Sequence, residues 1–238
     1  MNDISCWESK YQSCTYSESL INKINLQNEK SNHKVDILQI KKAIYYAKKY
    51  HGSQKRLSGE PYYSHPLAVA ELVAPYCFKT DILVTSILHD TIEDTDLTKD
   101  LIEHIFDANI AGKVEDLTRV KLDRKISAAE IVKILLLKHS YDLLFVKYCD
   151  RSHNMQSINV KPAREISKII EENLKCFTSV SIYFKATLPD FLKNETFNNL
   201  CYQKQPINKR YLSPYLMEIF EDDFQLPPLT FQNEKAQS

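Results

Sequence analysis

The chain has 238 residues, which is enough for one substantial hydrophobic core and too few for several full-sized domains. Lysine plus arginine equals aspartate plus glutamate at 31 each, so no overall basic charge would attract nucleic acid or an acidic membrane surface. With only three glycines, the sequence argues against a β-rich fold with many tight turns and against a glycine-rich phosphate loop.

Two features of the chain indicate a cytoplasmic location. The first residues, MNDISCWESKYQS, lack the basic and then apolar pattern of a secretion signal. No run of residues approaches the roughly 18 apolar side chains that a membrane-spanning helix needs. The six cysteines are scattered without close pairs, so we expect reduced thiols rather than a disulfide framework or a zinc site.

The two ends of the chain differ in composition from its middle. Residues 1–33 are polar and show no sustained period, so we predict a mobile leader or an irregular arm. We place one folded domain at residues 34–203. Residues 204–238 are interpreted as a C-terminal extension that is disordered in part, because they are polar and contain prolines.

The first predicted helix and the loop after it introduce the first candidate ligand. Apolar residues recur at three- and four-residue steps from Ile37, which predicts an amphipathic helix that ends near Tyr50. Residues 51–66 contain two glycines and two prolines and are predicted to form a loop. Because Pro66 suits the first turn of the next helix, His65 is expected at a helix N-terminus.

A more apolar segment begins near Asp81, a plausible N-cap, and its first residues would also suit a strand. We favour a single helix over residues 81–95, because acidic residues follow at helical spacing and no β–α alternation appears elsewhere. Further helices are predicted at residues 67–74, 98–107, 109–119, 127–139, 141–158 and 162–185. The predicted fold class is all-α, a helical bundle.

Histidine and aspartate occur in an order that indicates a metal site: His65, then His89 and Asp90, then Asp150. An isolated His-Asp pair is more often a capped or salt-bridged helix end. The argument for a metal site therefore depends on His65 before the pair and Asp150 after it. Two imidazoles and two carboxylates suit Mn²⁺, Fe²⁺ or Zn²⁺, with positions left for water and a phosphate oxygen. Such an ion activates water, which predicts hydrolysis of a phosphoester.

Two acidic residues follow the His-Asp pair. Glu93 and Asp94 lie four residues beyond His89 and Asp90, so on a continuous helix they share one face. At that place they would order or deprotonate the attacking water. The alternative is a solvated acidic face with no further role.

Polar residues on either side of the proposed ligands suggest a nucleotide pocket. Arg56 lies in the loop before His65, and its guanidinium would neutralise polyphosphate charge. Asp150, Asn154 and Ser157 follow one another at steps of four and three, so they share a helix face that could bind a nucleobase or ribose. We expect His153 to brace a metal ligand rather than bind the ion itself.

Four segments resemble the hydrolase domain of the RelA/SpoT alarmone enzymes: AKKYHGSQKRLSGEPYYSHPLAVAELV, ILHDTIEDT, DLTRVK and KYCDRSHNMQS. The similarity covers roughly residues 35–160 and continues weakly to about Gln203. The synthetase domain that normally follows is missing, which implies a hydrolase-only protein.

The resemblance implies an HD-type helical bundle that removes the 3′-pyrophosphate of guanosine tetraphosphate and pentaphosphate. It implies one Mn²⁺ held by His65, His89, Asp90 and Asp150, and catalysis by Glu93 and Asp94. It also implies a substrate pocket lined by Arg56, Ser58, Asn154 and Ser157, with Tyr62 or Tyr63 near the base of the loop. The expected partner is a small nucleotide, with no nucleic acid or membrane, and no oligomer is indicated.

The sequence departs from the family pattern at a few positions. Leu57 replaces the usual lysine of the loop, Cys149 and Ser152 replace an alanine and a leucine, and Ser157 replaces a threonine. The lost lysine removes a contact typically worth about 1.5 to 3 kcal/mol. Two alternatives therefore stay open: a phosphohydrolase that acts on another nucleotide, and a catalytically silent regulatory or binding module.

Overall fold

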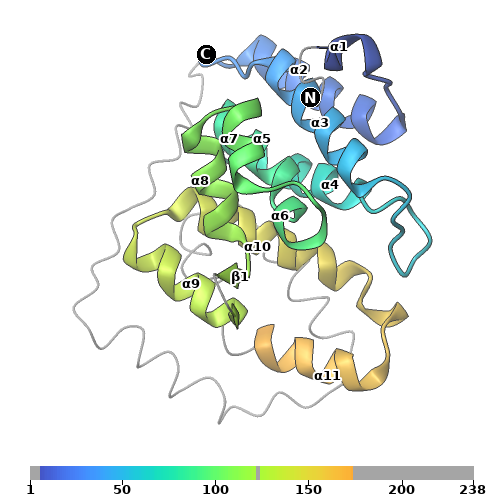
Figure 1. The fold of residues 1–238 in the computed structure, drawn as a ribbon, viewed down its shortest axis with the longest axis vertical. Coiled ribbons are helices and arrows are strands. Elements are labelled where there is room, and N and C mark those ends of the chain that lie inside the picture. The colour runs from blue at the N-terminus through green and yellow to red at the C-terminus, as the bar shows by residue number, and fades with distance from the viewer. Residues whose placement is uncertain (1–5, 122–123, 174–238) are drawn as a thin grey trace, which may run out of the picture. The chain divides into compact units, whose positions relative to one another are not determined.

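The computed structural model describes residues 6–121 and 124–173. The chain divides into two compact units, 1–160 and 161–238. Figure 1 labels most of the elements. Those of the first unit are α1 (Trp7–Lys10), α2 (Thr15–Lys30), α3 (Ile37–His51), α4 (Ser64–Val73), α5 (Thr80–Leu88), α6 (Thr91–Asp94), α7 (Lys99–Ile105), α8 (Ala108–Leu117), β1 (Val120–Lys121), β2 (Arg124–Lys125), α9 (Ala128–Leu137), α10 (Tyr141–Gln156) and the 3-10 helix η1 (Ile158–Val160). The described part of the second unit contains α11 (Ala163–Glu172).

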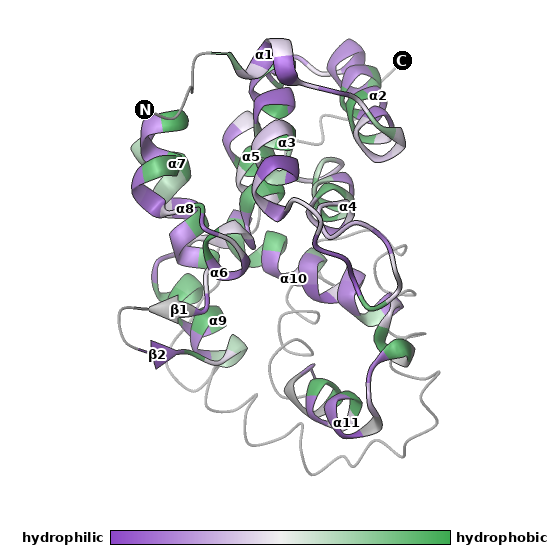
Figure 2. Ribbon diagram, turned by 45° about the vertical axis from the view of Figure 1, so that its right-hand side comes forward, coloured by the Kyte–Doolittle hydropathy of each residue, from purple (hydrophilic) through white to green (hydrophobic). Residues whose placement is uncertain are grey.

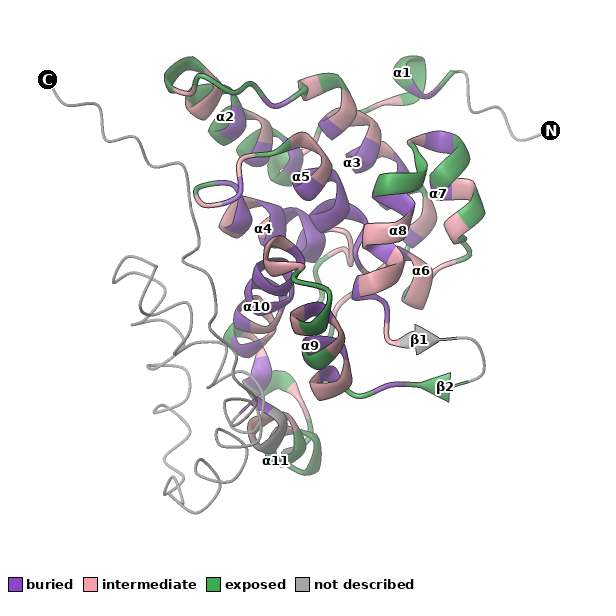
Figure 3. Cartoon of the chain, turned by 90° about the vertical axis from the view of Figure 1, so that its left-hand side faces the viewer, coloured by how far each residue is buried: buried purple, intermediate pink, exposed green. Residues whose placement is uncertain are grey.

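Helix α5 is the buried centre of the first unit. Every residue from Ile82 to Leu88 is buried, and the helix contacts α3, α4, α8 and α10. Figure 3 shows it in purple, enclosed by these helices. A helix that is apolar on all sides is stable only when it is covered on all sides. This packing fixes the place of His89, which follows α5 directly.

Helix α10 crosses this core and contacts α4, α5, α8 and α9. Leu144 and Phe145 are fully buried on it. The same helix buries two charged residues, because Lys147 is 5% exposed and Asp150 is 6% exposed. Burial of charged groups is costly unless they are paired, so their presence inside the bundle points to a polar site.

The helix ends follow local rules that the sequence displays. Asp36 caps α3, because its carboxylate accepts hydrogen bonds from the backbone N–H groups of Leu38 and Gln39. Gly52 ends that helix with a positive φ of 52°, a backbone conformation that glycine adopts without strain. At α9, Ser127 and Glu130 form a reciprocal capping box.

The prediction for the N-terminal segment was wrong in one respect. Residues 15–30 of the expected irregular leader form the helix α2, which packs against α3 and α4. Its buried apolar side chains, Leu20 and Ile24, make a stripe only one residue wide, and the remaining positions are mostly polar. A stripe this narrow gives a weak periodic signal, because most of the helix surface faces solvent.

The prediction of one helix over residues 81–95 was also wrong. Helix α5 ends at Leu88, and α6 starts again at Thr91. At the break, His89 Nδ1 lies 2.8 Å from the carbonyl of Ser86, and Thr91 Oγ1 donates to the carbonyl of Leu88 at 2.7 Å. These side chains occupy carbonyl groups that a continuing helix would use. Asp81 lies within the first turn of α5, and the N-cap is Lys79.

The other helices are confirmed with small shifts at their ends, and the all-α bundle is confirmed with them. In the described ranges, the sheet consists of β1 and β2, which pair antiparallel with Val120 opposite Lys125. Figure 2 shows β2 as hydrophilic. The last part of the helix predicted at 162–185 and the extension from residue 204 onward lie outside the described residues, and the domain limits stay a prediction.

None of the helices in residues 6–121 and 124–173 has the length and apolar character needed to cross a membrane. Cys6, Cys14, Cys77 and Cys149 form no disulfide.

Candidate metal centre

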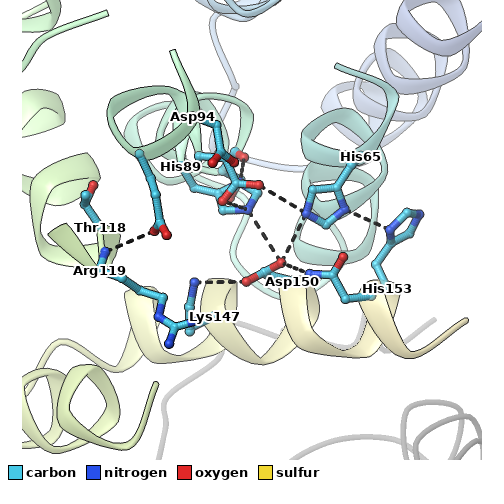
Figure 4. Close-up of polar contacts among 12 residues, drawn as sticks. His65, His89, Asp94, Thr118, Arg119, Lys147, Asp150 and His153 are labelled. Atoms are coloured by element: carbon cyan, nitrogen blue, oxygen red, sulfur yellow. Dashed lines mark hydrogen bonds and ion pairs between the residues drawn. The ribbon is translucent and has the colours of Figure 1, made fainter. Parts of the chain in front are cut away.

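Four side chains from three separate segments of the chain meet at one buried place, and Figure 4 labels His65, His89 and Asp150 among them. His65 lies in the first turn of α4, His89 and Asp90 at the break between α5 and α6, and Asp150 on α10. One ligand atom each from His65, His89 and Asp150 lies within 4.8 Å of the others. The histidines and aspartates whose order in the sequence indicated a metal site therefore lie together in the folded chain.

The helix break explains how two adjacent residues face the same cluster. Successive side chains of a regular α-helix point about 100° apart, so neighbours diverge. Here Asp90 Oδ1 lies 3.0 Å from His89 Nε2, and Asp90 Oδ2 lies 3.4 Å from His65 Nε2. Both residues direct their polar atoms inward because α5 has ended before them.

The hydrogen bonds of His89 leave one ring nitrogen for a ligand. Nδ1 donates to the carbonyl of Ser86 at 2.8 Å, which orients the ring and directs Nε2 into the cluster. Nε2 is fully buried, and no described residue forms a hydrogen bond with it. A buried imidazole nitrogen of this kind, facing two carboxylates, suits a divalent cation.

The spacing of the donor atoms fits one ion. Two ligand atoms about 2.1 Å from the same ion lie about 3.0 to 3.4 Å apart when the bonds meet at 90 to 109°. His65 Nε2 lies 3.1 Å from Asp150 Oδ1, which is within this range, and His89 Nε2 lies 3.7 Å from the same oxygen, slightly above it. The four residues thus form a mixed nitrogen and oxygen site able to hold a divalent metal.

The carboxylates set the charge of the cluster. Burial by itself would lower the pKa of His89, but the negative charges of Asp90 and Asp150 outweigh it and raise that pKa to about 10. Burial would raise the pKa of Asp150, yet Lys147 and the two histidines hold it well below its ordinary value. The site therefore favours positive charge at its centre.

Two residues of α10 hold the carboxylate of Asp150 from either side. Lys147 Nζ lies 3.0 Å from Oδ2. Asn154 Nδ2 donates to Oδ1 at 2.6 Å. Figure 4 shows Lys147 approaching Asp150 from the side away from His65. Together they fix the orientation of Asp150 before any ligand binds.

His153 braces His65, which agrees with the role expected for it. Their Nδ1 atoms lie 2.9 Å apart. Burial and the neighbouring charges of His65 and Arg56 lower the pKa of His153 to about 4, so its imidazole is neutral near pH 7. A neutral His153 can accept the Nδ1 proton of His65, which leaves His65 Nε2 free to bind an ion.

Glu93 and Asp94 point to different neighbours. Glu93 pairs with Lys125 of β2 at 2.5 Å and accepts a hydrogen bond from the backbone N–H of Arg119. Asp94 accepts a hydrogen bond of 2.6 Å from the Tyr62 hydroxyl. The sequence suggested that these carboxylates continue one helix face beyond His89 and Asp90. They do not, because α6 is separate from α5.

The loop between α3 and α4 reaches the far end of α10. Arg56 Nη2 donates to Asn154 Oδ1 at 3.2 Å and to Ser157 Oγ at 3.1 Å. The structure thus brings three of the four expected pocket residues together. Ser58 is exposed next to Gly59, whose φ of 92° turns the loop back toward α4.

Sequence reasoning missed Lys147 and left the role of Tyr62 open. Lys147 lies three residues before Asp150, the spacing at which helix side chains meet, and this signal was available. Tyr62 faces the site, stacked on the buried ring of His51 at 4.7 Å between centroids. Tyr63 faces away from it, against Tyr16 of α2. The choice between the two tyrosines needed the structure.

The helical fold and the buried histidine and aspartate cluster define the class of protein. Residues 43–181 match the HD domain family, and the chain belongs to this family. The resemblance to RelA/SpoT proteins is confirmed by its relatives. The chain is 38% identical over 148 residues to the GTP pyrophosphokinase rsh of Brucella ovis. The aligned segment covers 60% of this chain and 20% of the relative.

A second relative is named for a hydrolysis instead of a kinase reaction. The guanosine-3′,5′-bis(diphosphate) 3′-pyrophosphohydrolase of Aquifex aeolicus is 34% identical over 146 residues, covering 60% of this chain and 21% of the relative. The chain therefore spans about a fifth of the length of these relatives. A solved structure described as a metazoan ortholog of SpoT that hydrolyzes ppGpp is 18% identical, with a TM-score of 0.47, and covers 77% of this chain and 94% of its own.

Proposed function

We propose that the protein hydrolyses the 3′-pyrophosphate of guanosine tetraphosphate and pentaphosphate, releasing pyrophosphate and leaving GDP or GTP. The observation that carries this proposal is the convergence of His65, His89, Asp90 and Asp150 at one buried site. Membership of the HD domain family and the name of the Aquifex relative support it. The Brucella relative is named as a pyrophosphokinase, so the names of the two relatives do not agree on one activity. The assay described below therefore tests the hydrolysis directly.

We assign the binding of one Mn²⁺ to these four residues. When bound, such an ion supplies Lewis acidity toward a phosphoryl oxygen and lowers the pKa of water. The protein's own contribution is to hold the ligands in place: Ser86 orients His89, His153 orients His65, and Lys147 with Asn154 orients Asp150. Ligands held this way need little rearrangement to bind the ion.

Among the two proposed catalytic carboxylates, Asp94 is the better proton acceptor. Partial burial raises its pKa above the ordinary value, partly offset by the hydrogen bond from Tyr62. That bond occupies Oδ2 and leaves Oδ1 for a water molecule. Glu93 is held by Lys125 and by the backbone of Arg119, so we assign it the task of ordering this side of the site.

The nucleotide would lie between the loop and the end of α10. Arg56 offers a guanidinium that can bind a phosphate in two places, and Asn154 and Ser157 offer hydrogen bonds to a base or ribose. Ser58 is close enough in sequence to join them when the loop meets a ligand. The reaction consumes one water, whose hydroxyl joins pyrophosphate and whose proton ends on the ribose 3′-oxygen.

The test is pyrophosphate release from guanosine tetraphosphate by the intact chain with Mn²⁺. Asp150→Asn and a chelator should each abolish turnover. Asp116→Asn is the matched control, because Asp116 also pairs with a lysine, Lys138, but on the surface. Turnover that survives Asp150→Asn, or a Mn²⁺-loaded protein without turnover, would contradict the proposal.

One observation favours a second candidate, hydrolysis of a different nucleotide. Leu57 is 68% exposed beside Arg56, where the family resemblance implies a lysine. An exposed leucine offers no charge to a phosphate. Comparison of guanosine tetraphosphate with nucleotides that lack the 3′-pyrophosphate distinguishes the candidates, because the second predicts a higher kcat/KM for one of the latter.

A further inference from the structure

Lys147 is a charged residue in the interior of the bundle, and the proposed function gives it only the task of holding Asp150. Its side chain is 7% exposed, and its ammonium lies 3.0 Å from Asp150 Oδ2. The neighbouring residues Phe145, Val146 and Cys149 on α10 are fully buried. A lysine is rarely buried unless it is paired, because desolvation of its charge is costly. The ion pair with Asp150 is therefore a built part of this site.

The two oxygens of Asp150 have different partners. Oδ2 faces Lys147. Oδ1 accepts a hydrogen bond from Asn154 and lies 3.1 Å from His65 Nε2, inside the ligand cluster. The ammonium therefore pairs with Oδ2, and Oδ1 is the oxygen that lies in the cluster.

We propose that Lys147 is the fixed counter-cation of the metal centre, which orients Asp150, weakens the binding of divalent ions and restricts the centre to one ion. The inference rests on the metal site of the proposed function but not on its reaction. Asp90 and Asp150 bring two negative charges to the cluster, and Lys147 offsets one of them. One divalent ion then leaves a small positive excess, whereas a second ion would place a large uncompensated charge in a buried site.

The alternative role for Lys147 is to support the packing of Asp150 alone. The two roles predict opposite effects of removing the charge. If Lys147 is a counter-cation, its loss removes a repulsion and exposes Oδ2, so Mn²⁺ binds more tightly. If it only supports Asp150, its loss disorders a ligand, so Mn²⁺ binds more weakly.

The experiment is titration of the metal-free full chain with Mn²⁺, without nucleotide, followed by calorimetry or by the electron paramagnetic resonance signal of free Mn²⁺. Lys147→Gln keeps a hydrogen-bond donor toward Asp150 but removes the charge, and we expect its Kd to fall about tenfold or more. Lys147→Arg keeps the charge and should leave Kd within about threefold. Lys138→Gln, which breaks an exposed pair with Asp116, should leave it unchanged.

Several outcomes would overturn the inference. Binding by Lys147→Gln that is unchanged or weaker assigns Lys147 to support alone. If Lys147→Arg binds Mn²⁺ as tightly as Lys147→Gln does, the loss of charge is not the cause of the tighter binding. If the glutamine variant does not fold, binding of more than one Mn²⁺ at the centre of the unaltered protein still overturns the inference. Failure of the unaltered protein to bind Mn²⁺ overturns the inference with the metal site, whereas binding without hydrolysis contradicts only the proposed function.

Discussion

Arg56 links the loop between α3 and α4 to the proposed nucleotide pocket, and its replacement tests that pocket. Its Nη2 donates two hydrogen bonds, to Asn154 at 3.2 Å and to Ser157 at 3.1 Å. Hydrogen bonds of a charged group contribute about 1.5 to 3 kcal/mol when they are shielded from water. Arg56 is half-buried, and one phosphate contact of this size corresponds to a change of about 10- to 150-fold in kcat/KM.

We therefore expect Arg56→Ala to lower kcat/KM for guanosine tetraphosphate by about 10- to 150-fold, chiefly through a higher KM. The kcat/KM of Arg56→Lys should lie between those of Arg56→Ala and the unaltered protein, because lysine keeps the charge but not the planar guanidinium with its paired donors. The assay is steady-state pyrophosphate release with Mn²⁺. Lys55→Ala, an exposed neighbour in the same loop, serves as the control. An Arg56→Ala enzyme within about threefold of the unaltered protein would refute this account of the pocket.

A double-mutant cycle separates the anchoring of Arg56 from its contact with substrate. Ser157→Ala is the better partner for this cycle, because Asn154 also holds the proposed metal ligand Asp150, so replacing Asn154 would disturb Arg56 and Asp150 together. If Ser157 positions the guanidinium, the two replacements should couple by about 0.5 to 1.5 kcal/mol in kcat/KM. Strict additivity would show that Arg56 reaches the substrate without this anchor.

Further predictions concern the ion, the proton acceptor and the fold. Mn²⁺ at 100 times Kd should stabilise the protein by about 2.7 kcal/mol in thermal unfolding, and Asp150→Asn should remove the effect. Partial burial raises the pKa of Asp94 and the Tyr62 hydrogen bond opposes this rise, so Tyr62→Phe should move the acid limb of the kcat/KM profile to higher pH. In urea unfolding, Leu83→Ala in α5 should cost about 2 to 5 kcal/mol. Asp36→Ala at the start of α3 should cost about 1 kcal/mol.

The first three of these predictions each have a contrary result. A Mn²⁺ effect that survives Asp150→Asn places the ion elsewhere. An acid limb that stays in place or moves to lower pH in Tyr62→Phe shows that Asp94 is not the titrating acceptor. A loss below about 1 kcal/mol for Leu83→Ala would show that α5 is not the tightly packed centre of the unit.

The sequence predicted most helices because their signals are local. The three- and four-residue periodicity of α3 and the pairing of Ser127 with Glu130 at α9 act within one or two turns of chain. The helix α2 escaped prediction because only Leu20 and Ile24 among its apolar residues are fully buried. Its stability as a helix comes from packing against α3 and α4, which no local pattern records.

For the site, the sequence by itself determined which chemical groups are present, and the order of His65, His89, Asp90 and Asp150 indicated a metal site. The tertiary structure decided how they are used. The end of α5 at Leu88 directs His89 and Asp90 inward and separates them from Glu93. The burial of α10 makes Lys147 a partner of Asp150. Residue types are fixed by the sequence, but burial and orientation depend on helices that meet only when the chain folds, so the charge balance of the centre is a property of the fold.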